Sequence, residues 1–185
     1  MKKLIIVHGA FGIGKSTLIE KILQDVDIKL IKKDTIKEFL FDYLGVFDQK
    51  WSSLLGRASN KMSLDLIGEL FGEYDKIMFE NLFWYDQSRK DIKEFIIKNQ
   101  IDALEIFCYA DADARKERYI KRVKSGESHS GHNNDLENIP DFEFENAQYQ
   151  PIGLSEMAQI DLTSLLSDEY DKLLINIKNF LMEEK

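Results

Sequence analysis

The sequence predicts an α/β domain built on a parallel sheet with helices on both faces. Apolar runs typical of buried strands alternate along the chain with amphipathic helical patterns, which indicates βαβ units. Right-handed crossovers between parallel strands place the helices on both faces of such a sheet. A chain of 185 residues suits one domain, so residues 1–185 are expected to fold as a single unit.

The expected elements follow one another in order. The first apolar run is followed by a glycine-rich segment and then by a helical stripe of apolar residues. The expected strands are residues 4–7, 28–33, 76–79, 104–110 and 159–162. The expected helices are residues 15–26, 35–44, 51–71, 89–99, 112–124 and 170–181. The polar, acidic stretch 127–153 contains both prolines and is expected to be a loop.

Composition and charge narrow the classes of function. The formal net charge is −8 and the sequence pI is near 5.0, whereas tight nucleic-acid binding usually rests on a basic surface. Nucleic acid is therefore a disfavoured partner, and an anionic membrane surface is disfavoured for the same reason. Cys108 is the single cysteine, so no intrachain disulfide can form, which favours a cytoplasmic location. The oligomeric state stays open at this stage.

The segment after the first strand carries the strongest motif. Residues 9–16 match the phosphate-binding pattern G-x-x-x-x-G-K-[ST]. Its glycines let successive backbone N–H groups point at phosphate oxygens, and the helix that begins here adds its positive dipole end. Lys15 is expected to reach the β- and γ-phosphates, and the Ser16 hydroxyl to hold Mg²⁺. The predicted nucleotide-binding residues of this P-loop are Gly9, Ala10, Phe11, Gly12, Ile13, Gly14, Lys15, Ser16 and Thr17.

Three classes of P-loop protein compete for this sequence. A GTPase normally carries an Asn-Lys-x-Asp motif, but Asn60-Lys61 is followed by Ser63 in the place of the Asp. A mechanical or regulatory ATPase usually needs a larger domain. A small kinase needs a P-loop, a carboxylate near the acceptor hydroxyl and a closing lid with cations, all of which this chain offers. Mg²⁺-dependent transfer from ATP to a hydroxyl group is therefore predicted, with a nucleotide-binding regulatory module as an alternative.

Two carboxylates come at the ends of predicted strands. Asp34 follows the second strand, so it should project from the carboxyl edge of the sheet and orient a substrate hydroxyl. The competing interpretation is that Asp34 is simply the N-cap of helix 35–44. Glu80 ends the third strand, where an acid would contact the Mg²⁺ shell together with Ser16. A strand-end carboxylate exposed to solvent is an equally compatible interpretation of Glu80.

Three arginines on helix 112–124 are candidate phosphate ligands. Arg115, Arg118 and Arg122 are spaced three and four residues apart, so they should share one face of the helix. They are expected to bind phosphates and to stabilise charge on the transferring group, in a lid of about residues 112–153. Arg115 is thus added to the predicted nucleotide-binding residues. A solvated basic face is the competing interpretation.

Other residues have two interpretations each. Arg57 lies among apolar neighbours on helix 51–71 and could hold an acceptor or form a surface salt bridge. Four aromatics could line the acceptor pocket, although core packing is the favoured interpretation: Trp51, Phe83, Trp84 and Tyr85. His129 and His132 could contact substrate or nucleotide when the lid closes. A zinc site built from them is disfavoured, because Cys108 lies inside an apolar strand.

Seven short segments carry a resemblance to a known group: residues 8–17, 33–37, 55–58, 80–84, 117–122, 125–127 and 131–132. Together they resemble the small P-loop kinases of AAA type. Relatives of that group include polynucleotide 5′-hydroxyl kinases, chloramphenicol phosphotransferase, gluconate kinase and zeta-toxin kinases. The resemblance covers nearly the whole chain, and only its first segment is highly specific by itself.

The resemblance implies a P-loop NTPase three-layer sandwich, with a five-stranded parallel sheet of order 2-3-1-4-5 and a lid after strand four. It implies that Asp34 activates the acceptor hydroxyl and that Arg118 and Arg122 serve the lid. The predicted catalytic residues are therefore Lys15, Asp34, Arg118 and Arg122. The predicted cofactors are ATP and Mg²⁺.

The resemblance also bears on the acceptor. Polynucleotide kinases carry an Arg three residues after the catalytic Asp, where this chain has Lys37, a point charge rather than a bidentate fork. They also tend to carry Asp-Thr-Asn after strand three, where this chain has Glu-Asn-Leu at 80–82. A small-molecule acceptor is therefore preferred, and a polynucleotide 5′-hydroxyl kinase remains the alternative. The predicted acceptor-binding residues are Asp34, Lys37, Arg57 and Phe83.

Overall fold

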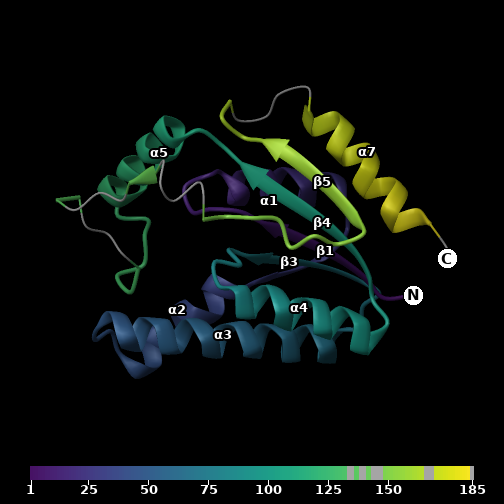
Figure 1. Cartoon of the computed structure of the whole chain (residues 1–185), viewed down its shortest axis with the longest axis horizontal. Helices are drawn as coiled ribbons and strands as arrows, with labels where there is room; N and C mark the ends of the chain where they lie inside the picture. The colour runs from purple at the N-terminus through teal and green to yellow at the C-terminus, as the bar shows by residue number, and fades with distance from the viewer. Residues whose placement is uncertain (133–135, 138–140, 143–147, 165–168, 184–185) are drawn as a thin grey trace.

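The protein folds around a parallel five-stranded sheet of order β2-β3-β1-β4-β5 (Figure 1), which confirms the expected order. The computed structural model describes residues 1–132, 136–137, 141–142, 148–164 and 169–183. The strands are β1 (Lys3–His8), β2 (Lys29–Lys32), β3 (Lys76–Asn81), β4 (Asp102–Tyr109) and β5 (Glu156–Asp161). The helices are α1 (Lys15–Asp25), α2 (Lys33–Leu44), α3 (Gln49–Leu70), α4 (Asp86–Asn99), α5 (Ala112–Ser125) and α7 (Glu169–Met182).

Helices cover both faces of the sheet, as the alternating pattern predicts. Apolar residues of α1 and α7 pack with one face of β1 and β4 in a core that contains Ile5, Leu18 and Ile177. Apolar residues of α3 and α4 pack with the other face in a core around Ile6 and Ile67. Figure 1 shows α3 and α4 on one side of the sheet and α7 on the other. The result is the expected three-layer sandwich.

The strand register brings the carboxyl ends of the strands to one edge. Val7 of β1 lies opposite Glu80 of β3 and Ile106 of β4, and Lys32 of β2 also lies opposite Glu80. Every strand pair is parallel, so the loops that follow the strands meet at this edge. The P-loop, the start of α2 and the segment after β3 are therefore neighbours.

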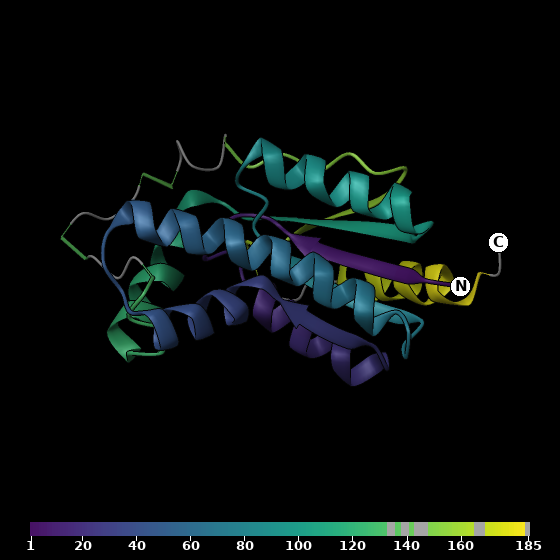
Figure 2. The same ribbon diagram turned by 90° about the horizontal axis from the view of Figure 1, so that it is seen from below.

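Two boundaries differ from the sequence-based expectation in ways that matter for the site. Helix α2 begins at Lys33, with Lys32 as its N-cap residue, so Asp34 lies in the first helical turn and is not the N-cap. Helix α4 begins at Asp86 rather than at residue 89. Figure 2 shows α2 and α3 side by side, and together they form one wall beside the carboxyl edge of the sheet. None of the helices within the described ranges is long and apolar enough to cross a membrane.

Candidate active site

The P-loop curls tightly between β1 and α1 because three of its positions need glycine. Gly9, Gly12 and Gly14 all have positive φ, at 139°, 76° and 107°. A Cβ on Gly9 would lie 2.2 Å from the carbonyl oxygen of Cys108 in the neighbouring strand β4. The chain passes so close to β4 that no side chain fits at this position, and it then turns into α1. The segment is coiled, as anion binding by its backbone amides requires.

Lys15 lies at the start of α1 and closes over the loop. Its side chain is buried, and its Nζ donates hydrogen bonds to the carbonyl oxygens of Gly9 at 3.1 Å and Ala10 at 2.8 Å. Burial lowers the pKa of Lys15 from its ordinary value, and the negative charge of Glu80 opposes this shift. Ser16 is exposed at the first turn of the helix, so its hydroxyl is accessible beside the loop.

Glu80 occupies the end of β3, next to the P-loop. Its carboxylate lies 3.9 Å from Nζ of Lys32, and its side chain is mostly buried. Burial raises the pKa of Glu80, and the charges of Lys15 and Lys32 act in the opposite direction. Glu80 and Ser16 thus present a carboxylate and a hydroxyl, which are oxygen ligands of the kind that Mg²⁺ takes.

The three arginines of α5 divide between two positions. Arg115 is fully buried, and its Nε donates to the carbonyl oxygen of Phe11 at 3.0 Å. Arg118 donates from Nη1 to Ile13 O at 2.6 Å, and from Nη2 to the carbonyl oxygens of residues 162 and 163 at 2.8 and 2.9 Å. Both side chains therefore bind the backbone of the P-loop. Arg122 instead lines the large cavity described next.

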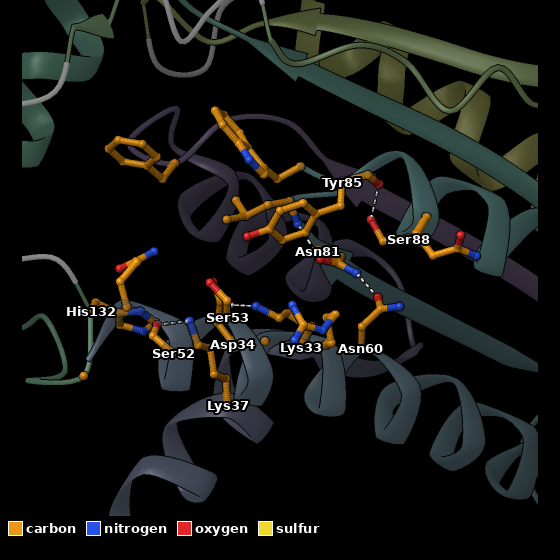
Figure 3. Close-up of a pocket in the computed structure, with 18 of the residues that line it drawn as sticks. Lys33, Asp34, Lys37, Ser52, Ser53, Asn60, Asn81, Tyr85, Ser88 and His132 are labelled. Carbon is orange, nitrogen blue, oxygen red and sulfur yellow. Dashed lines mark hydrogen bonds and ion pairs between the residues drawn. The ribbon is translucent and has the colours of Figure 1, made fainter. Parts of the chain in front are cut away.

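A cavity of about 580 Å³ opens between the carboxyl edge of the sheet, α2 and α3 (Figure 3). This volume is in the range that binds small molecules. Its basic side chains are Lys33, Lys37, Arg57, Lys61 and Arg122, and its acidic ones are Asp34 and Asp91. Its aromatic side chains are Phe11, Trp84, Tyr85, Tyr119 and Tyr149.

Asp34 lies in the cavity wall between two lysines. Its Oδ1 accepts a hydrogen bond from Nζ of Lys33 at 2.8 Å, and its side chain is 44% exposed. Burial raises the pKa of Asp34, but the charge and hydrogen bond of Lys33, together with the charges of His132 and Lys15, outweigh burial and hold the pKa below its usual value. Lys37, one turn further along α2, donates to Oγ of Ser52 at 3.0 Å. Asp34 is therefore an ionised carboxylate that faces a space large enough for a substrate.

Asp34 and the P-loop lysine are electrostatic neighbours. The charge of Asp34 raises the pKa of Lys15, and the charge of Lys15 lowers that of Asp34, although neither is the largest influence on the other. The structure thus brings the predicted phosphate-binding lysine and the predicted acceptor-side carboxylate to one site. Arg57 lines the same cavity, as its predicted acceptor role requires.

The aromatics after β3 take two positions, which corrects part of the sequence interpretation. Phe83 is 1% exposed and packs edge-on against Phe79 and His8, so it belongs to the core and not to the cavity wall. Its φ of 51° turns the chain sharply after β3. Trp84 and Tyr85, for which core packing was favoured, line the cavity instead and are 37% and 49% exposed.

Polar groups that the sequence interpretation did not single out support the cavity. Nδ2 of Asn81 donates to Oδ1 of Asn60 at 2.8 Å, which joins the end of β3 to α3. Oδ1 of Asn81 accepts from the backbone N–H of residue 82 at 2.7 Å. The position of Asn81 at a strand end, next to Glu80, is the signal that could have identified it.

His129 and His132 both contact α2. Nε2 of His132 lies 2.8 Å from Oε1 of Glu38, and Nε2 of His129 lies 3.0 Å from Oδ1 of Asp42. Gly131 lies against the Phe41 ring, where a Cβ would come within 2.3 Å of a ring carbon. Within the described part of the chain, no group of three or more His, Cys, Asp or Glu could hold a metal ion. Gly131 and His132 also line the cavity, so this part of the chain after α5 contributes to the cavity wall.

A second buried polar cluster lies next to the start of the P-loop, between the end of β1 and the middle of β4. Nε2 of His8 lies 2.8 Å from Oε1 of Glu105, and both side chains are buried. Glu105 also accepts three backbone N–H groups: those of Ile152 at 2.6 Å, Gly153 at 2.8 Å and Leu154 at 2.9 Å. A charged residue within an apolar strand is a signal that could have identified Glu105.

Comparison with known proteins identifies the family and the fold. The sequence profile of an AAA domain matches residues 4–138. A candidate kinase from Chloroflexus aurantiacus J-10-fl superposes with a TM-score of 0.80 at 22% identity, over 97% of this chain and 96% of the other. The tunicamycin resistance protein of Deinococcus radiodurans gives 0.63 at 13% identity, over 100% and 98%.

A gluconokinase from Sinorhizobium meliloti 1021 superposes with a TM-score of 0.58 at 14% identity, over 96% of this chain and 92% of the other. No curated protein sequence matches the chain significantly. The superpositions establish the fold, and the profile covers most of the chain with its P-loop, α2 and β3. The chain therefore belongs to the AAA domain family and has the fold of the small P-loop kinases.

Proposed function

We propose that this protein is an ATP-dependent phosphotransferase that moves the γ-phosphoryl group to a hydroxyl of a small-molecule acceptor. One observation carries the proposal: Asp34 faces a cavity of about 580 Å³ and interacts electrostatically with Lys15 of the P-loop. The donor phosphates and the acceptor hydroxyl can thus meet between these two side chains. Several superposing proteins are kinases, which supports the same reaction class.

The transfer conserves atoms and charge in a single displacement. The acceptor oxygen forms a bond to the γ-phosphorus, the bond from that phosphorus to the β–γ bridging oxygen breaks, and ADP leaves with the electron pair. Asp34 would accept the hydroxyl proton, since it faces the cavity and its pKa, which is held below the usual value, keeps it ionised at neutral pH. Lys15 would turn from the carbonyl oxygens of Gly9 and Ala10 to the phosphate oxygens.

Residues for Mg²⁺ are present at the same edge of the sheet. The exposed Ser16 hydroxyl and the Glu80 carboxylate fit a hard cation that also takes phosphate oxygens as ligands. Bound Mg²⁺ would neutralise charge on the β- and γ-phosphates. Arg122, from the cavity wall, supplies a further cation for the transferring group.

The proposal is tested by measuring transfer from γ-labelled ATP with Mg²⁺ to a panel of hydroxyl acceptors. Lys15→Ala should abolish turnover, because the loop loses its phosphate-binding cation. Asp34→Asn should keep the ATP affinity and lower kcat by about 10²–10⁴-fold, the usual contribution of a positioned base. Asp65→Asn on the exposed side of α3 is the matched control and should have the wild-type rate.

Two results would contradict the proposal. ATP binding without product for any acceptor would indicate a regulatory nucleotide-binding module. Wild-type turnover in Asp34→Asn would remove the base role from this carboxylate.

A further inference from the structure

The charge around the cavity is opposite in sign to the charge of the whole chain. The protein carries a formal net charge of −8, yet the described residues that line the cavity include five basic and two acidic side chains. Like charges in a concave space repel one another, and low-dielectric walls strengthen the repulsion. An acidic protein that concentrates basic groups in one cavity is built to receive negative charge there.

Only part of this basic charge is neutralised by the protein. Lys33 pairs with Asp34 at 2.8 Å, and Lys61 pairs with Asp91 at 3.5 Å. Three further cations of the cavity have no carboxylate of the described residues within ion-pair distance: Lys37, Arg57 and Arg122. These three groups are available to an anionic ligand.

Lys37 of α2 and Arg57 of α3 both line the cavity, and α2 and α3 contact each other. Nζ of Lys37 donates to Oγ of Ser52 and lies 3.9 Å from the place that a Cβ on Gly56 would take. Burial and the nearby Lys33 charge both lower the pKa of Lys37. Arg57 follows Gly56 directly on α3 and lines the same cavity. An anion at this point would offset the repulsion between the lysines and accept the forked donors of the guanidinium.

The opposite side of the cavity is aromatic. Trp84 and Tyr85 stay 37% and 49% exposed, and Trp84 packs edge-on against Tyr149 with ring centroids 4.9 Å apart. Figure 3 shows Tyr85 across the cavity from Asp34 and Lys37. Exposed aromatic rings beside a cavity suit a flat ligand group, which can stack on them at little conformational cost.

We infer that the acceptor is a small molecule with both an anionic group and a planar ring. Arg57 and Lys37 bind the anion, and Trp84 and Tyr85 bind the ring. A nucleoside monophosphate has both features, and a cavity of about 580 Å³ encloses a ligand of that size. The inference rests on the proposed function, because it identifies the class of molecule whose hydroxyl would reach Asp34.

A matched set of probes tests the inference by binding. The probes are thymidine, thymidine 3′-monophosphate and thymidine 5′-monophosphate. Each monophosphate differs from thymidine by a single phosphate, on the 3′ or the 5′ oxygen. Their affinities are measured by titration calorimetry on the full chain, with the P-loop first saturated by a non-hydrolysable ATP analogue and Mg²⁺. At least one monophosphate should bind about tenfold or more tightly than thymidine, because the phosphate gains charge-assisted hydrogen bonds.

Two variants locate the effect. Arg57→Gln should remove most of the preference for the monophosphate and leave thymidine binding nearly unchanged. Lys90→Gln removes the same charge from an exposed position on α4 outside the cavity, and it should keep the full preference.

Several outcomes would overturn the inference. Equal affinities for thymidine and both monophosphates would remove the anion site. So would a failure of both monophosphates to bind, or an equal weakening of all three probes by Arg57→Gln. A 5′-hydroxyl oligonucleotide that binds far more tightly than either monophosphate would replace the small molecule with a nucleic acid. Failure of phosphoryl transfer to every acceptor contradicts the proposed function alone, since the binding preference is measured without transfer.

Discussion

Substituting Glu105 by Gln tests the buried cluster beneath the P-loop. The Glu105 carboxylate is fully buried and accepts hydrogen bonds from three backbone N–H groups and from His8. The pKa of Glu105 lies below its ordinary value, since the bonds from His8 and the backbone outweigh the burial that raises it. The site therefore favours the charged carboxylate over a neutral group of the same shape.

The expected loss of stability follows from these bonds. A Gln amide offers one acceptor oxygen where the carboxylate has two, so at least one backbone N–H among residues 152–154 loses its acceptor. An unsatisfied buried donor costs about 1–3 kcal/mol, and the remaining bonds weaken when the acceptor loses its charge. Together these effects should lower the free energy of unfolding by about 2–4 kcal/mol.

Urea denaturation followed by circular dichroism measures this change. The midpoint should fall and the m-value should stay constant, because the folded structure is retained. Glu94→Gln, at an exposed position on α4, is the control and should change stability by less than about 0.5 kcal/mol. If Glu105→Gln were as stable as this control, the reasoning about the buried cluster would be refuted.

Three further predictions concern the P-loop and the residues around the ends of β1 and β3. Gly9→Ala should lower the free energy of unfolding by at least about 2 kcal/mol, because the added Cβ would collide with the carbonyl oxygen of Cys108. Gly126→Ala is the control: it has open space around it and should lower the free energy of unfolding by about 1 kcal/mol. Equal losses for the two variants in thermal melts would contradict this prediction. Asn60→Leu leaves the Asn81 amide without its acceptor and should cost about 1–3 kcal/mol in urea denaturation, and an unchanged midpoint would show that this bond contributes nothing. Burial lowers the pKa of His8, so as pH falls the unfolded chain takes up a proton at this residue before the folded protein does. The free energy of unfolding should therefore fall as pH drops below about 6.5, the ordinary pKa of histidine. His8→Asn should flatten this fall between pH 7 and 5, and an unchanged pH profile would exclude the histidine as its source.

The sheet could be predicted from sequence because its residues follow a repeating physical rule. Buried parallel strands form continuous apolar runs, and the P-loop glycines mark the turn from β1 into α1. The boundaries of α2 and α4 were less predictable. Asp34 was expected outside the helix as its cap, but the chain already turns into α2 at Lys33.

The cavity could be predicted only in part. Asp34 was identified from its position after a strand, Arg57 from its position along a helix and Lys37 from the resemblance to polynucleotide kinases, and all three line it. The sequence could not show which of Phe83 and Trp84 is buried, because both are aromatic residues at the end of the same strand. Their burial is decided by the turn of the backbone at Phe83. The left-handed backbone of Phe83 sends its ring into the core and sends the next residue toward solvent.

The arginines of α5 show the same limit. Helical spacing places three cations on neighbouring positions, but it does not reveal which carbonyl oxygens lie nearby. Arg115 and Arg118 donate hydrogen bonds to backbone carbonyl oxygens of the P-loop, and Arg122 does not.

The attachment of Arg115 and Arg118 bears on how the active site can close. An outward swing of the whole of α5 would break hydrogen bonds to Phe11 and Ile13 of the P-loop, and those to the chain after β5. The first two turns of α5 therefore move with the nucleotide-binding frame. In the proposed reaction, a hinge beyond Arg118 would keep these bonds and let the far end of the helix, with Arg122, approach and leave the acceptor.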